Sequence, residues 1–191
     1  DSDDKVPFWR ELGKRVRDAG AKYIVQLAFS GRQRDIPSVQ YETGLSSTDK
    51  ADPVHGFRCE RMTRAQIAEV VDSFAQAARR AREAELDGIE IHGCNGYLIT
   101  QFLSPAINDR DDEYGGSLEN RARFWRETIE QVKEAVGDEC AIAVRMSTDM
   151  FMGEAGTQLK RDCLPFVELV DELVDVWDIN LYGIAEWGED A

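Results

Sequence analysis

Polar side chains stand at the ends of three predicted strands. Gln26 ends one apolar segment, His92 ends the next, and Arg145 ends the third. Strands of a parallel sheet are buried and apolar, so a polar residue at each carboxyl end suits a ligand site better than packing. A single His at such a position is more often a hydrogen-bonded part of the scaffold, and a single Arg is as often a member of an ion pair. Because three successive strands share the feature, a common pocket becomes as plausible as a scaffold role.

The segment that follows His92 adds two more candidates. His92, Asn95 and Tyr97 place an imidazole, an amide and a phenol close together along the chain. His92 and Asn95 can donate hydrogen bonds to a carbonyl or nitro oxygen and so stabilise developing negative charge. Tyr97 can deliver a proton to carbon. The alternative is that Asn95 and Gly96 form a turn while Tyr97 packs in the core, and residue types alone slightly favour it.

Hydrophobic periodicity predicts four helices that alternate with four strands. Helices are expected over 8–19, from a capping box at Thr63 onward, from the cap at Ser117 to 136, and over 164–173; strands are expected over 23–27, 88–92, 141–145 and 176–180. This order predicts an α/β fold with parallel strands and right-handed crossovers. A doubly wound open sheet and a (β/α)8 barrel both fit. A whole barrel needs about 250 residues, so in a barrel this 191-residue chain would be the middle portion.

Two connections in this pattern are unusually long. They span 28–62 and 93–116, and both leave the carboxyl end of a strand, where ligands bind in either architecture. Structureless loops of this length are uncommon unless they are functional. Since no linker and no repeat of 20–50 residues interrupts the chain, residues 1–191 are expected to belong to one domain.

Composition narrows the class of partner. The net charge of −14 repels phosphate backbones and anionic lipids, so neither nucleic acid nor membrane binding is expected. There is no run of 18 apolar residues and no signal-peptide order at the acidic N-terminus, so a cytoplasmic location is expected. The chain does not start with Met, which suggests that it is cut from something longer.

The four cysteines are widely spaced, and none has metal-ligand spacing to His92. This spacing predicts reduced thiols and no metal site for Cys59, Cys94, Cys140 and Cys163.

A long stretch of the chain resembles a known family. Residues 89–126 read IEIHGCNGYLITQFLSPAINDRDDEYGGSLENRARFWR, and they resemble the signature of the old yellow enzyme family of FMN-dependent oxidoreductases. This family also includes 2,4-dienoyl-CoA reductases, 2-enoate reductases and trimethylamine dehydrogenases. QLAFSGR at 26–32 and VRMS at 144–147 resemble two further family motifs, in the right order. The resemblance implies an FMN-binding (β/α)8 TIM barrel, of which this chain is roughly strands three to six, truncated at both ends.

The resemblance also implies roles for the candidate residues. Gln26 resembles the residue that hydrogen-bonds the flavin pyrimidine edge, and Arg145 resembles the cation beside flavin N1, where the reduced ring carries negative charge. His92 and Asn95 resemble the pair that binds the activating oxygen of the substrate. Tyr97 resembles the donor of the proton to the substrate α-carbon.

The implied activity is reduction of an activated C=C bond, in an enone, enoate or enoyl thioester, by hydride from flavin that NAD(P)H has reduced. An amine dehydrogenase is the runner-up, although a His-x-x-Asn pair favours an oxygen-bearing acceptor over a cationic amine, which would want aromatic faces. A non-catalytic barrel fragment is the third alternative. Some large relatives carry an iron–sulfur cluster and a second nucleotide (FAD) domain, but none of the four cysteines matches those ligands. The expected partner is a small unsaturated carbonyl compound, and a homo-oligomer remains open.

Two further features qualify the resemblance. Phe29 replaces a His that many relatives have, which predicts a changed pocket lining and not lost activity. The charged stretch from Asp109 to Arg121 is predicted to order its loop through ion pairs and to cap a helix at Ser117, without a part in the reaction.

Overall fold

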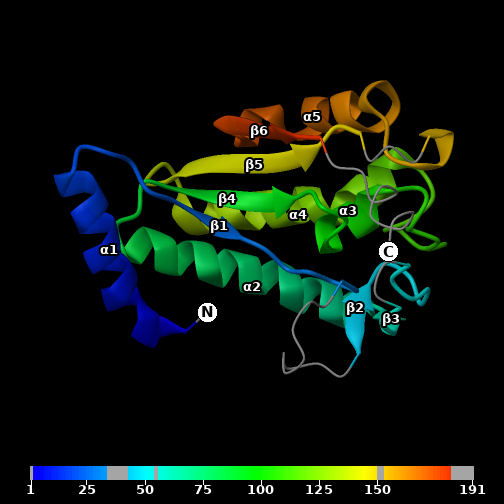
Figure 1. Ribbon diagram of the computed structural model, residues 1–191, viewed down its shortest axis with the longest axis horizontal. Helices are drawn as coiled ribbons and strands as arrows, with labels where there is room; N and C mark the ends of the chain where they lie inside the picture. The colour runs from blue at the N-terminus through cyan, green and yellow to red at the C-terminus, as the bar shows by residue number, and fades with distance from the viewer. Residues whose placement is uncertain (1, 34–42, 54–55, 150–152, 182–191) are drawn as a thin grey trace.

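A four-stranded parallel sheet forms the centre of the computed structural model, which describes residues 2–33, 43–53, 56–149 and 153–181. The strands lie in the order β1-β4-β5-β6, with bounds Ile24–Leu27 (β1), Gly88–Gly93 (β4), Ala141–Ser147 (β5) and Val176–Asn180 (β6). Each strand thus lies beside the next long strand of the chain (Figure 1). This confirms the predicted α/β class with a parallel sheet.

The predicted helices alternate with these strands along the chain. Their bounds are Val6–Asp18 (α1), Arg64–Glu83 (α2), Leu118–Val136 (α4) and Leu164–Val170 (α5). The capping box at the start of α2 is present, because Thr63 Oγ1 accepts from the Gln66 N–H at 3.3 Å and Gln66 Oε1 accepts from the Thr63 N–H at 2.9 Å. Ser117 Oγ likewise caps α4 by accepting from the Asn120 N–H at 3.3 Å. Local sequence signals therefore fixed the starts of both long helices.

The two faces of the sheet differ in polarity. Helices α2 and α4 pack against each other and cover one face, on which Ile89, Ile91, Ile142 and Val144 are fully buried. Side chains at i and i+2 of a strand share a face, so the intervening residues of β1, β4, β5 and β6 point to the other side. That face carries mostly polar and charged side chains.

The structure departs from the predicted elements in the long connections. The first holds two short strands paired in parallel, Gly44–Ser46 (β2) and Cys59–Arg61 (β3), while 34–42 and 54–55 lie outside the described residues. The second holds the helix Leu98–Leu103 (α3). Three-residue strands are too short to show a period, and α3 is buried on all sides and therefore has no amphipathic pattern. Figure 1 shows β2, β3 and α3 gathered at the end of the sheet toward which β4 and β5 point.

Some predicted boundaries were wrong by a few residues. Strand β5 continues to Ser147, so Arg145 lies two residues inside the strand instead of at its end. Strands β1 and β4 each extend one residue beyond Gln26 and His92. Helix α5 ends at Val170, is preceded by a π-helical turn at Leu159–Cys163, and is followed by a 3-10 turn at Asp171–Leu173.

Candidate functional site

The polar face of the sheet brings the predicted strand residues together in rows. His92 of β4 is level with Arg145 of β5, which is level with Asp178 of β6. Gln26 of β1 is level with Glu90 of β4, one row nearer the start of the strands. Gln26, His92 and Arg145 therefore share one face, although Gln26 does not stand in the same row as the other two.

Arg145 is the central cation of this face. Its Nη1 lies 3.2 Å from Asp178 Oδ2, and both side chains are half-buried. Within the part of the chain that the structure describes, the buried Nε of Arg145 and the buried hydroxyl of Ser147 have no hydrogen-bond partner. Buried polar atoms are normally paired, so two unsatisfied donors on the same face of one strand indicate a place for a polar ligand.

The Gln26 side chain is exposed on this face, and its Nε2 donates to Glu90 Oε2. Glu90 was not assigned a role from the sequence; the structure makes it the partner of Gln26. An amide held by a carboxylate keeps its own carbonyl oxygen and second N–H for another partner. Gln26 can therefore serve as both donor and acceptor to a ring system lying on the sheet.

His92 is held as a neutral imidazole. Its side chain is only 6% exposed, and burial, helped by the positive charge of Arg145, lowers its pKa below the ordinary 6.5, with Asp178 opposing the shift. The Nε2 atom lies 3.5 Å from the sulfur of buried Cys94. A neutral imidazole offers one donor and one acceptor, so His92 can still donate to a ligand oxygen.

The turn after β4 carries the other two predicted residues. Asn95 and Gly96 adopt left-handed backbone conformations, with φ of +59° and +69°, so the turn expected from Asn-Gly is present. The ring of Tyr97 nevertheless lies beside His92, with ring centroids 5.2 Å apart. The structure therefore brings His92, Asn95 and Tyr97 together, and the turn is what places the latter two.

Two residues of β6 were not predicted from the sequence to belong to the site. Asp178 pairs with Arg145, and Asn180 Nδ2 donates to Asn95 Oδ1 at 3.2 Å. Both are polar residues in an otherwise apolar strand, which is the same signal that identified Gln26, His92 and Arg145 on the other strands. They would have been found if that criterion had been applied to all four strands.

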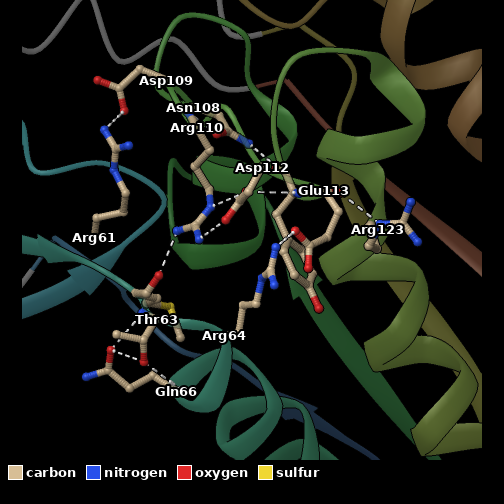
Figure 2. A network of polar contacts seen from close by, with 12 residues as sticks. Arg61, Thr63, Arg64, Gln66, Asn108, Asp109, Arg110, Asp112, Glu113 and Arg123 are labelled. Atoms are coloured by element: carbon tan, nitrogen blue, oxygen red, sulfur yellow. Dashed lines mark hydrogen bonds and ion pairs between the residues drawn. The ribbon is translucent and has the colours of Figure 1, made fainter.

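The charged loop before α4 is a separate network, shown in Figure 2. Arg110 is buried; it pairs with Asp112 and donates to the carbonyl oxygen of Met62 at 2.8 Å. Arg61 pairs with Asp109 at 3.0 Å, and Arg64 pairs with Glu113. These contacts tie the loop to the β3–α2 junction (Figure 2), which confirms the prediction that ion pairs order it.

Other expectations concern thiols, metals and membranes. All four cysteines are free and buried. Over the described ranges, no group of three or more His, Cys, Asp or Glu residues is placed to hold a metal ion. In the same part of the chain, no helix has the length and apolar character needed to cross a membrane.

Comparison with known proteins places these features in a family. The NADH:flavin oxidoreductase / NADH oxidase family model matches residues 1–191. The chain is 43% identical over 126 residues to dimethylamine dehydrogenase of Hyphomicrobium sp. (strain x), covering 66% of this chain and 17% of that protein. It is 38% identical over 197 residues to an NADPH dehydrogenase of Clostridium acetobutylicum, covering 96% of this chain and 56% of that protein.

A solved structure of an old yellow enzyme homologue from Zymomonas mobilis matches with a TM-score of 0.80 and 28% identity, over 93% of this chain and 53% of that one. The chain thus spans between about a sixth and somewhat more than half of these relatives. The resemblance expected from residues 89–126 is confirmed: this chain belongs to the NADH:flavin oxidoreductase / NADH oxidase family, which includes old yellow enzyme-like proteins.

Proposed function

We propose that the chain is the central part, roughly strands three to six, of a (β/α)8 barrel in a longer flavoprotein that reduces activated C=C bonds with NAD(P)H. The parallel order β1-β4-β5-β6 is what one arc of such a barrel requires. The polar residues of the polar face would then point into the barrel near its carboxyl end. The family membership supports an oxidoreductase, and the substrate class rests on the geometry of the turn after β4.

The residues of the polar face suit FMN. The unsatisfied Nε of Arg145 and hydroxyl of Ser147 are donors for the carbonyl edge of a flavin, and Gln26 offers a donor and an acceptor one row away. When bound, FMN would supply the transfer of hydride from NAD(P)H to the substrate. Arg145 would supply a fixed positive charge where the reduced ring is anionic.

The proposed substrate class rests on the hydrogen bond between Asn180 and Asn95. Asn180 Nδ2 donates to Asn95 Oδ1, so the Asn95 oxygen already accepts one hydrogen bond. No hydrogen bond links Asn95 Nδ2 to any residue that the structure describes. Asn95 therefore presents donors, as does neutral His92, and a pair of donors suits a carbonyl, carboxylate or nitro oxygen. Tyr97, beside His92, would give its proton to the α-carbon while hydride reaches the β-carbon.

Amine oxidation is the second candidate, because dimethylamine dehydrogenase is similar to this chain over 126 residues. The donor pair of His92 and Asn95 would not stabilise a cationic amine. Phe29 and Tyr97, in the two loops that border the site, are aromatic residues of the kind that would contact such a cation. An amine substrate would reduce the flavin, and an enone would oxidise it. The two candidates therefore predict opposite half-reactions.

The test uses the longer flavoprotein under anaerobic conditions. Flavin absorbance should be present as purified, and NAD(P)H should bleach it. Addition of 2-cyclohexenone should restore the oxidised spectrum, while dimethylamine should leave oxidised flavin unchanged. Bleaching by dimethylamine without reoxidation by an enone or enoate would replace the proposal with the amine candidate. A protein that holds no flavin would favour the non-catalytic alternative.

A further inference from the structure

Gln101 is a completely buried amide of α3 whose side chain contacts two loops at once. Its Nε2 donates to the carbonyl oxygens of Gly96 at 2.7 Å and Ser30 at 3.1 Å, and its Oε1 accepts from the Arg32 N–H at 3.2 Å. An amide side chain has two N–H donors and one acceptor oxygen, so every polar atom of Gln101 is engaged. The loop after β1 is thereby tied to the turn after β4.

Gly96 is the residue between Asn95 and Tyr97, and its carbonyl is the anchor of their turn. The turn holds two consecutive left-handed residues, one of which is not glycine, a conformation that costs energy unless the surroundings hold it. Within the turn, the Tyr97 N–H reaches the Cys94 carbonyl at 3.2 Å. The Gly96 carbonyl accepts from Gln101 and also from Gln33 Nε2 at 3.2 Å.

The loop after β1 is shaped to receive Gln101. Gly31 has φ of +66°, and a Cβ built on it would lie 2.7 Å from Gln101 Nε2 and 2.8 Å from Cδ. Both contacts are too close for a side chain, so only glycine allows the amide to reach the loop. The backbone of Gln101 is held as well, because Ser47 Oγ donates to the main-chain carbonyl oxygen of Gln101 at 2.6 Å. Gln101 is therefore fixed from three directions.

We propose that Gln101 is a positioning residue of the site: by holding the Gly96 carbonyl, it places the Asn95 amide and the Tyr97 hydroxyl relative to His92. Gln101 does not touch the substrate. The consequence for catalysis rests on the proposed function, whereas the consequence for the turn does not. A displacement of about 1 Å in a reacting group can lower a rate about a hundredfold, so small movements of this turn matter.

The first measurement tests the turn itself. Gln101→Met keeps the volume of the side chain and removes its three hydrogen bonds. In the longer flavoprotein, amide hydrogen exchange over residues 94–98 should become about tenfold faster or more than in the parent. Gln33→Met is the matched control, because it removes one longer bond to the same carbonyl and should have a smaller effect. Unchanged exchange over 94–98 in Gln101→Met would overturn the proposal, whatever the substrate is.

The second measurement separates positioning from general damage. Chemically reduced flavin is reoxidised either by 2-cyclohexenone, which needs the donor pair and Tyr97, or by ferricyanide, which needs neither. Gln101→Met should slow the enone reaction by at least about tenfold and leave the ferricyanide reaction and the flavin content unchanged. Gly31→Ala should reproduce this pattern, because its methyl group would displace the Gln101 amide from the opposite side.

The outcomes remain distinct. Faster exchange with a parental enone rate would overturn the positioning role, and so would equal slowing with both oxidants or loss of flavin. A parent enzyme that fails to react with any enone or enoate would overturn the proposed function. In that case the exchange measurement still decides whether Gln101 holds the turn.

Discussion

Two polar regions of this molecule differ in how far their side chains satisfy one another. In the loop before α4, Arg110 is paired with Asp112 and bonded to the Met62 carbonyl, and Asn108 Nδ2 donates to the carbonyls of Phe102 and Tyr114. On the sheet face, Arg145 Nε and Ser147 Oγ have no partner among the described residues. Both regions are rich in charged groups. In the first, the buried Nε of Arg61 also lacks a hydrogen-bond partner in the described part of the chain, but it lies 3.6 Å from the Asp49 carboxylate.

The difference separates scaffold from site. A network whose members satisfy each other gains rigidity and has nothing left to offer a ligand. Unsatisfied donors cost free energy unless a ligand completes them. The loop before α4 was the most recognisable part of the sequence. Its charged side chains, however, bind the loop to the β3–α2 junction. Changes in the loop should therefore affect stability, and changes on the sheet face should affect binding and catalysis.

The largest expected effect is at Tyr97. Tyr97→Phe removes the hydroxyl group and keeps the ring against His92. Reoxidation of the flavin by 2-cyclohexenone should slow roughly 10²–10⁴-fold, the usual scale for general acid catalysis. Flavin reduction by NAD(P)H should stay nearly unchanged. Anaerobic stopped-flow absorbance measures each half-reaction separately, and a parental reoxidation rate would show that Tyr97 is not the acid for this substrate.

The opposite pattern is expected at Arg110. Arg110→Met removes the ion-pair partner of Asp112, which keeps only the Tyr114 N–H among the described residues, and the donor to the Met62 carbonyl. Breaking a buried ion pair typically costs about 3 kcal/mol of unfolding free energy. Urea unfolding of the flavoprotein should show this loss, while the enone reoxidation rate of the folded enzyme stays parental.

Arg64→Met is the matched control for Arg110, because the Arg64–Glu113 pair is exposed on the surface. Its loss should cost less than about 1 kcal/mol. If Arg110→Met slowed reoxidation while stability held, the loop would belong to the site and the distinction between the two regions would fail.

A smaller effect is expected at Arg145. Arg145→Ala removes the charge proposed to face the flavin, and a hydrogen bond to a charged group is worth about 1.5–3 kcal/mol. The affinity for FMN should fall roughly 10–100-fold, and the reduction potential of the flavin should become lower. Arg145→Lys should recover part of the potential because it keeps the charge without the planar fork. Fluorescence titration with FMN and spectroelectrochemistry measure the two quantities, and parental values for both would remove Arg145 from the flavin site.

Much of the fold was predictable because its signals are local. The caps at Thr63 and Ser117 and the apolar periodicity of α2 and α4 depend on residues a few positions apart. Strand β6 was predicted over its observed range, Val176–Asn180. The short strands β2 and β3 and the helix α3 were not predicted, since their stability comes from contacts with distant segments, such as the Ser47–Gln101 bond.

The candidate site was predictable in part for the same reason. Gln26, His92 and Arg145 stand out as polar residues in apolar strands, and the family resemblance supplied expected roles for Asn95 and Tyr97. Nothing in the sequence around Gln101 indicates that its amide reaches Ser30 and Gly96. Pairings of this kind depend on how two loops meet, which periodicity and turn chemistry do not specify. Asn180 was missed although its strand was placed correctly, because the polar-residue criterion was not extended to β6.

The smallest effect concerns the charge of His92. Burial and the nearby Arg145 lower the pKa of His92 below 6.5, so the imidazole should stay neutral as pH rises from about 6.5 to 8. The rate of reoxidation by 2-cyclohexenone, which has no titrating group, should be flat over this range, with any change due to His92 appearing at lower pH. His92→Asn is the control, because it keeps a donor and does not titrate.

The unfolded chain takes up the proton of His92 at a higher pH than the folded chain does. The unfolding free energy of the parent relative to His92→Asn should therefore fall as pH drops through about 6.5. Arg145→Ala should weaken this dependence, since it removes one cause of the lowered pKa. A break in the rate above pH 6.5 that is present in the parent and absent in His92→Asn would mean that the imidazole is charged in the working enzyme, and the neutral donor proposed for the substrate oxygen would have to be replaced by a cationic one.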